Sequence, residues 1–207
     1  MGFPSCLLPR KWRGLTRFFV GNLVCSFVFH PAVHSITKRG NPSMIHLEKI
    51  DAKNVWDVLD LKVAKAQKGF VASNDISLVQ AYVAADTACR AFPFAVFNDK
   101  KAVGFLMIGF NEAALYELDD EKPPEALKNN YSLWRLMIDK KYQGKGFGRE
   151  AIKLALDFIR TWPCGKAEYC ELSYEPENEV AAKLYHAFGF VENGEMDGDE
   201  VVAVLKL

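Results

Sequence analysis

The sequence predicts an α/β fold, a single domain in which helices flank one mixed central β-sheet. Two observations support this prediction. From Met44 onward, apolar runs typical of strands alternate with segments whose apolar residues recur at helical spacing. The chain has 207 residues, of which 50% are hydrophobic and 25% charged, and this length and composition suit one core of ordinary globular character.

The first half of this region is typical of a strand, two helices and a β-hairpin. Asp51 is a favourable N-cap residue, and Val55 and Leu59 begin a helical spacing behind it. Asn74 or Asp75 can cap a shorter second helix. The expected elements are a strand at 45–50, a helix at 51–66, a loop at 67–73, a short helix from 74, and strands at 92–97 and 102–110 around a turn at 98–101.

The second half begins with an acidic loop and then alternates strands and helices. One helix carries an apolar stripe that includes Ile152, Leu156 and Ile159. Gly189 ends the following helix. The expected elements are a loop at 111–130, strands at 133–138 and 168–174, helices at 148–161 and 179–188, and a last strand at 201–207 that pairs with residues 190–191.

Residues 1–43 differ from the rest of the chain. Basic residues precede an apolar run at 18–29, which is far shorter than the roughly 20 residues needed to span a bilayer. The run also resembles the core of a signal peptide, but no clean small-x-small cleavage site follows. We expect residues 1–43 to be an extension outside the fold and residues 44–207 to form the domain, with a membrane anchor as the alternative.

Charge and cysteine content exclude several classes of protein. The formal net charge is zero, whereas a nucleic-acid-binding protein usually has a basic excess. The five cysteines form no C-x-x-C pair, and Pro31 interrupts the spacing of His30 and His34. We therefore expect a cytoplasmic protein with reduced thiols, no metal, no nucleic-acid partner and no membrane partner.

A glycine-rich turn is the most informative segment. The apolar strand that ends in Leu136-Met137-Ile138 leads into Gln143-Gly144-Lys145-Gly146-Phe147-Gly148-Arg149, and a helix begins there. Glycines let a backbone approach a ligand closely, and the first turn of a helix offers unpaired N–H groups, so the segment suits a pyrophosphate. It lacks the Walker A pattern and the full dinucleotide-binding pattern. The alternative is a tight connection between a strand and a helix.

This turn resembles the Q/R-x-x-G-x-G/A signature of the GNAT acyl-CoA N-acyltransferases. A second segment, residues 178–190, is similar to the family's N-x-x-A-x-x-L-Y-x-x-x-G-F pattern. The resemblance covers residues 44–207. It implies a central sheet that is splayed at the cofactor site, acetyl-CoA as the acyl donor, and acetylation of an amine.

The resemblance also implies roles for particular residues. A backbone N–H of Met137 or Ile138 would polarise the thioester carbonyl, and Tyr185 would be the general acid, unless it is simply a core tyrosine. Asn178 either contacts the cofactor or only caps its helix. The cofactor-binding residues implied are Leu136, Met137, Ile138, Gln143, Gly144, Lys145, Gly146, Phe147, Gly148, Arg149 and Asn178.

The acceptor is expected to be a small-molecule amine. The chain most resembles bacterial diamine and spermidine/spermine N-acetyltransferases, and the acidic residues of the 111–130 loop either attract a polycation or are simply solvated. Related enzymes often carry a carboxylate base where this chain has Trp134, which either lines the acceptor pocket or is a buried strand residue. Glu171, Glu112 or a water chain would then serve as the base. The acidic residues of the loop are Glu112, Glu117, Asp119, Asp120, Glu121 and Glu125.

Two other functions remain open at this point. In the first, the enzyme acetylates an antibiotic, an amino acid or a peptide amine. In the second, the chain is a non-catalytic module that binds acyl-CoA. GNAT enzymes are often dimers, so the resemblance also allows a homodimer.

Overall fold

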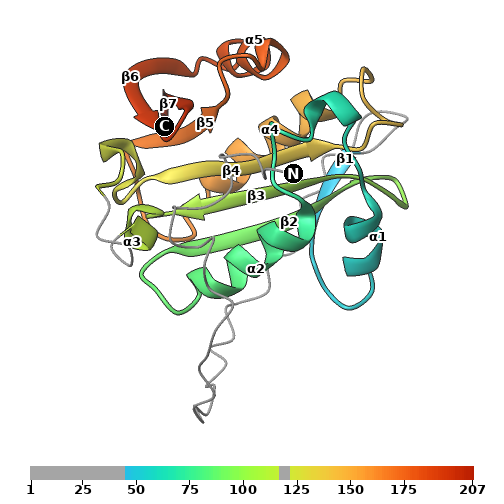
Figure 1. Cartoon of the computed structure of the whole chain (residues 1–207). Helices are drawn as coiled ribbons and strands as arrows, with labels where there is room; N and C mark the ends of the chain where they lie inside the picture. Colours follow the sequence, from blue (N-terminus) through green and yellow to red (C-terminus); the bar gives the residue numbers. More distant parts are fainter. Residues whose placement is uncertain (1–44, 117–121) are drawn as a thin grey trace, which may run out of the picture.

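Seven strands form one sheet in the computed structural model, which describes residues 45–116 and 122–207 (Figure 1). The strand order is β1-β2-β3-β4-β5-β7-β6. The pair β4–β5 is parallel and the other neighbouring strands are antiparallel, so the predicted mixed sheet is confirmed. The strands are β1 (Ile45–Lys49), β2 (Arg90–Asn98), β3 (Lys101–Phe110), β4 (Tyr131–Ile138), β5 (Tyr169–Tyr174), β6 (Val191–Asp197) and β7 (Glu200–Lys206).

Helices cover both faces of the sheet (Figure 1). On one face, α1 and α2 cover a core that includes Val58, Phe105 and Met137. On the other face, α4 buries its apolar stripe in a larger core with Leu133 and Leu172. The helical elements are α1 (Val55–Asp60), η3 (Lys65–Gln67), α2 (Asn74–Ala84), α3 (Ala113–Tyr116), η5 (Glu125–Leu127), α4 (Phe147–Ile159) and α5 (Glu179–His186).

The first helix is much shorter than predicted. We expected residues 51–66, whereas α1 ends at Asp60 and Leu61 turns to an extended conformation. The reason is tertiary: the backbone N–H of Lys62 donates to Asp139 Oδ2 (2.8 Å), and its carbonyl accepts from the N–H of Lys140 (3.0 Å). These contacts use the backbone groups that a longer helix needs for its own hydrogen bonds.

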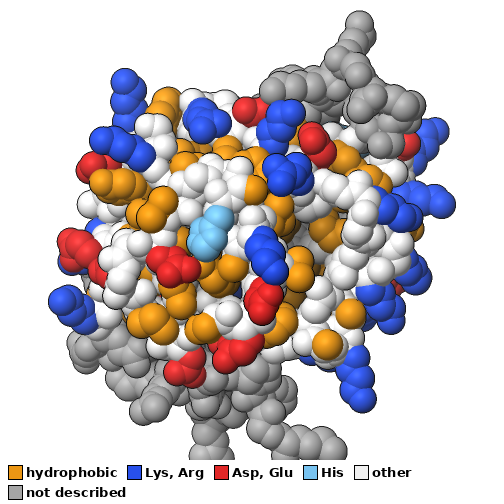
Figure 2. All heavy atoms as spheres, turned by 90° about the horizontal axis from the view of Figure 1, so that it is seen from above, with side chains coloured by type: hydrophobic (Ala, Val, Ile, Leu, Met, Phe, Trp, Pro, Cys, Tyr) orange, Lys and Arg blue, Asp and Glu red, His pale blue; other side chains and the backbone are white. Residues whose placement is uncertain are grey.

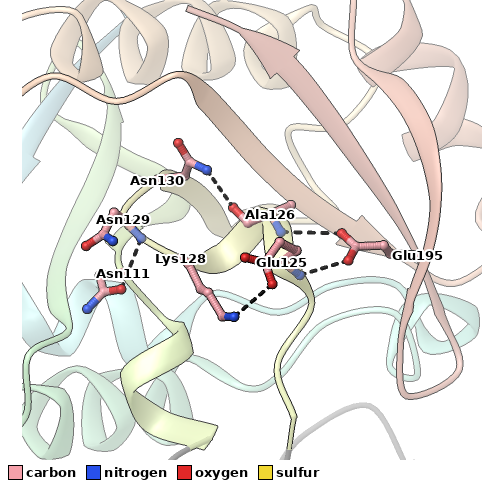
Figure 3. A network of polar contacts seen from close by, with 7 residues as sticks. All are labelled: Asn111, Glu125, Ala126, Lys128, Asn129, Asn130 and Glu195. Atoms are coloured by element: carbon pink, nitrogen blue, oxygen red, sulfur yellow. Dashed lines mark hydrogen bonds and ion pairs between the residues drawn. The ribbon is translucent and has the colours of Figure 1, made fainter.

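The predicted 111–130 loop contains two short helical elements, and its far end is fixed to the C-terminal hairpin. The carboxylate of Glu195 on β6 accepts hydrogen bonds from the backbone N–H groups of Glu125 (2.8 Å) and Ala126 (3.3 Å) at the start of η5 (Figure 3). A carboxylate is favourable at this end of a helical turn, where N–H groups are unpaired. The hairpin itself confirms the predicted last strand, although β6 extends well beyond residues 190–191.

Two predictions fall outside the described residues. The expected extension at 1–43 is one of them, and the other concerns Glu117, Asp119, Asp120 and Glu121 of the acidic loop. Within the residues that are described, no helix has the length and apolar character to cross a bilayer, and no group of side chains suits a metal ion.

Candidate active site

The central strands β4 and β5 separate soon after they pair. Their parallel pairing consists of Tyr131 with Cys170 and Ser132 with Glu171. Just beyond this pairing, β4 bulges against β3. Between Ser132 and Arg135, two residues of β4 lie opposite a single residue of β3. A bulge of this kind bends the strand that carries it. The second half of β4 therefore pairs with β3 on one side and borders a gap towards β5 on the other.

The backbone of β4 presents N–H groups to this gap. Asp139 donates its N–H to a carbonyl of β3 (2.9 Å), and in antiparallel pairing successive residues point alternately towards the partner strand and away. Leu136 and Ile138 therefore direct their N–H groups into the gap, whereas Met137 directs its own to β3. The N–H and the carbonyl of one strand residue point to the same side, and the Ile138 carbonyl accepts from Gln143 Nε2 (2.9 Å), which supports this direction. Of the two expected polarising groups, geometry favours Ile138 over Met137.

The glycine-rich turn follows directly. Gly144 and Gly146 have φ values of 74° and 81°, a left-handed conformation that costs other L-residues energy. Gly146 is the N-cap of α4, and no side chain caps that end. The first hydrogen bond of the helix runs from the N–H of Glu150 to Gly146, so within the described residues the N–H groups of the preceding turn have no acceptor. This end of α4 can therefore bind phosphate oxygens.

Two side chains hold the turn in place. Gln143 Nε2 donates both to the Ile138 carbonyl and to Gln67 Oε1 (2.9 Å each), and Gln67 also accepts from the N–H of Ala64. Asp139 is buried, and its carboxylate accepts from the N–H groups of Lys62 and Lys141. The sequence indicated Gln143 as a cofactor residue but not Asp139 or Gln67. An aspartate directly after a strand is a common turn residue, which is the signal that was available for Asp139.

Positive charge surrounds the turn. Lys140, Lys141, Lys145 and Arg149 are exposed, and Lys145 and Arg149 also lie over aromatic rings, at 5.4 Å and 5.5 Å. Figure 2 shows one face of the molecule, on which Lys and Arg side chains lie along both edges and across the middle, and apolar side chains reach the surface between charged ones. Cations beside unpaired N–H groups favour an anionic, phosphate-bearing ligand.

Tyr185 lies on α5, which meets the start of α4 beside the gap. A Cβ on Gly148 would lie 3.6 Å from Leu184 and 3.8 Å from Ile138, so α5, α4 and the end of β4 come together there. The Tyr185 ring packs against those of Tyr174 and Phe190. Burial, followed by the negative charge of Glu200, raises the pKa of Tyr185, so its phenol keeps its proton at neutral pH.

Asn178 begins α5. Its side chain accepts a hydrogen bond from the N–H of Ala181 (3.3 Å), so the predicted cap is present. The alternative role of Asn178, contact with a cofactor, stays a prediction.

Buried acidic side chains lie at the vertex where β4 and β5 part. Glu112 follows β3, Glu171 lies on β5, and each exposes less than a tenth of its surface. The Ser132 hydroxyl donates to Glu112 Oε1, and Gly109 leaves the space that this contact needs. Burial raises the pKa of Glu112 to about 8, and burial together with the charge of Glu112 raises the pKa of Glu171 well above its ordinary value. The structure thus brings together two of the three predicted substrate residues.

Asp197 extends this cluster from the C-terminal hairpin. Its Oδ1 accepts from the Tyr116 hydroxyl (2.6 Å), and burial raises its pKa. The positive charge of Arg135 partly offsets the rise in the pKa of Glu112 and of Asp197, so Arg135 lies near the cluster. The sequence indicated neither Asp197 nor Tyr116, because residues 81 positions apart carried no pattern that linked them.

Trp134, the third predicted substrate residue, is half-buried on β4. It packs against a small core of Ala84, Cys89 and Ala114, and the Arg135 guanidinium lies 5.7 Å from its ring centre. Trp134 is thus a strand residue, as one alternative had it, but it is only half-buried, and its π-face already has a cation of this chain beside it. A contact of Trp134 with substrate stays a prediction.

A sheet with a gap between two parallel strands, a glycine-rich helix start and a tyrosine beside both define the class of acyl-CoA-dependent acyltransferases that the sequence resembled. Comparison with known proteins agrees. The profile of a family described as "Acetyltransferase (GNAT) family" matches residues 57–190, and the chain belongs to this family. It is an N-acetyltransferase.

Similar proteins fall in the same class. A probable spermine N(1)-acetyltransferase of Bacillus subtilis subsp. natto is 30% identical over 76% of this chain and 96% of its own length. A spermine/spermidine N(1)-acetyltransferase of Bacillus subtilis is 29% identical over the same shares. The crystal structure of spermidine N-acetyltransferase from Vibrio cholerae with CoA and spermine has a TM-score of 0.52 and 19% identity, and the match covers 79% of this chain and 94% of that one.

Proposed function

We propose that this N-acetyltransferase uses acetyl-CoA to acetylate a polyamine such as spermidine or spermine. The carrying observation is the acidic cluster at the vertex of the gap, in which Glu112 and Glu171 are buried and Asp197 is half-buried. Arg135 supplies one positive charge beside three carboxyl groups, and an added ammonium group would favour their ionised form, because a nearby opposite charge favours the charged state. A ligand with two or more ammonium groups complements this cluster and at the same time can present an amine to the gap. The two Bacillus relatives support the same substrate class.

The donor site follows from the described geometry. The unpaired N–H groups at the start of α4 and the exposed cations around it fit a pyrophosphate, and the gap beside β4 fits an extended chain that reaches inwards. When bound, acetyl-CoA supplies the acetyl thioester. The N–H of Ile138 faces the gap and would donate to the thioester oxygen, and the Tyr185 phenol would donate a proton to the departing sulfur.

The experiment is thiol release from acetyl-CoA with a panel of amines. We expect spermidine and spermine to give kcat/KM at least ~10-fold above a monoamine of similar reactivity, because one additional ionic contact contributes about 1.4 kcal/mol or more. The panel also holds putrescine, an aminoglycoside, free lysine and a peptide. Release with one of these and not with the polyamines would overturn the polyamine assignment and leave the acetyltransferase class intact.

The Tyr185→Phe variant is the control for enzymatic transfer. It keeps the ring packing against Tyr174 and Phe190, so we expect unchanged CoA affinity and a kcat about 10²-fold lower, since general acids typically contribute 10²–10⁴. Equal kcat in both proteins would remove Tyr185 from the mechanism.

A further inference from the structure

The two faces of β5 carry different chemistry. Cys170, Leu172 and Tyr174 point into the core beneath α4, on the face where Tyr185 also packs. Because side chains alternate along a strand, Glu171 and Ser173 project to the opposite face. The gap between β4 and β5 therefore has the proposed acid on one face and a row of polar groups on the other.

Glu200 stands in this polar row, at the start of β7. The Ser173 hydroxyl donates to Glu200 Oε2, and β7 pairs with β5 so that Val201 lies opposite Tyr174. Val201 belongs with the core on the face of α4, so alternation places Glu200 on the face of Ser173. The negative charge of Glu200 contributes to the raised pKa of both Glu171 and Tyr185, so Glu200 lies near the buried cluster and near the proposed acid.

Glu200 also differs from the other acidic groups in its exposure. Glu112 and Glu171 are buried at the vertex, and burial raises the pKa of both carboxyls, to about 8 for Glu112 and well above the ordinary value for Glu171. Glu200 is half-buried, so it can bind an incoming ammonium and then pass a proton to solvent. A base for this reaction needs such access, because a Lys-like ammonium has a pKa of about 10.4 and must lose a proton before it can attack.

We propose that Glu200 is the group that receives the reacting ammonium and removes its proton, with Ser173 orienting the carboxylate. This role rests on the proposed function. The carboxylate takes one proton from R–NH₃⁺, and the freed lone pair forms the C–N bond at the acetyl carbonyl carbon. The C–S bond breaks, the departing thiolate takes the Tyr185 proton, and the second proton lost from nitrogen restores that phenol. One proton leaves through Glu200 per turnover.

The test compares Glu200→Gln with Asp199→Asn, a variant of the exposed neighbouring carboxylate. At pH 7 we expect Glu200→Gln to lower kcat/KM for the amine at least ~30-fold, within the range of a general base, with the KM for acetyl-CoA unchanged. The loss should shrink as pH rises, because more of the amine is then neutral without a base. Asp199→Asn should match the wild type.

The pH profile separates this role from a structural one. The charged and titratable groups around Glu200 are Glu171 on β5, Asp197 opposite it on β6 and, from the face of α4, Tyr185 on α5, while the Ser173 hydroxyl donates to its carboxylate. His186 and Glu192 contact the Tyr174 hydroxyl on the face of α4. A loss of equal size at every pH, or an equal loss in both variants, would overturn the proposal. The comparison uses whichever amine the wild-type enzyme turns over best, so a failure of the polyamine assignment leaves the test of Glu200 intact.

Discussion

At the scale of single residues, the candidate site contains some groups that keep their protons and others that can exchange protons with solvent. Tyr185 is packed between aromatic rings near the negative charge of Glu200, and both effects preserve the phenol as a donor. Glu112 is buried beside Ser132, and its raised pKa has a consequence for stability as well as for binding. The folded protein holds this proton over a pH range in which the unfolded chain has already lost it.

Glu112→Gln should therefore stabilise the protein at alkaline pH. The folded pKa of about 8 lies above the ordinary 4.5, so the contribution of Glu112 to stability is complete below pH 4.5 and is lost as pH rises to about 8. Glutamine keeps an oxygen for the Ser132 hydroxyl and has no charge to bury. We expect a gain in the free energy of unfolding on the order of 4 kcal/mol at pH 8.5 and little gain at pH 4.5, measured by urea unfolding.

The matched control is Glu125→Gln on the same loop, an exposed carboxylate paired with Lys128. It should change unfolding by only ~0.5 kcal/mol at either pH, as exposed ion pairs do. If Glu112→Gln gave the same change at both pH values, the proton on Glu112 would not be the cause.

At the scale of elements, the junction of β4, the glycine-rich turn and α4 combines features that the sequence indicated with contacts that it did not. The turn, the helix and its apolar stripe follow from local patterns, and α4 begins within one residue of its predicted start. The shortened α1 depends instead on Asp139 and Lys140, which take the backbone groups of Lys62 from across the fold. No periodicity in residues 51–66 contains that information.

Gly146→Ala should weaken CoA binding through the backbone of this junction. The φ of 81° disfavours a Cβ by about 1–2 kcal/mol although the space around it is empty, so the turn must shift or be strained. We expect CoA affinity, measured by calorimetry, to fall about 10-fold, as a cost of that size predicts.

Gly165→Ala provides the control, because Gly165 is also left-handed (φ 101°), has equally open surroundings and lies beyond the other end of α4. It should lower thermal stability similarly and leave CoA affinity unchanged. Equal losses of CoA affinity in both variants would mean that the glycine turn has no special role in binding.

At the scale of the whole molecule, the strands β1 to β7 form one sheet with a core and helices on each face. The strand β1 begins at Ile45 and forms one edge of the sheet, where it pairs with β2. The described residues thus supply both faces of the sheet, the gap and the acidic cluster. This supports our proposal that residues 1–43 are not needed for the catalytic domain.

A protein that starts at Met44 should therefore have the kcat and the melting temperature of the full chain. The measurement is thiol release with the best amine of the panel, together with thermal unfolding of both proteins. Co-sedimentation with lipid vesicles serves as the control for an anchor: binding by the full chain and not by the shorter one would assign residues 18–29 to a membrane. A loss of activity or of cooperative unfolding on shortening would refute the proposed boundary.

The sequence by itself determined the class of fold, the family and the position of the glycine-rich turn, because these depend on local signals: helical and strand periodicity, glycines that permit left-handed φ, and two short motifs around Gly146 and Tyr185. Only the tertiary structure decided which β4 amides face the gap, where β4 leaves β5, and that Glu112, Glu171 and Asp197 meet at the vertex. The reason is physical. These features arise from strand register, a bulge and burial, which join residues far apart in the chain and leave no pattern in any one segment.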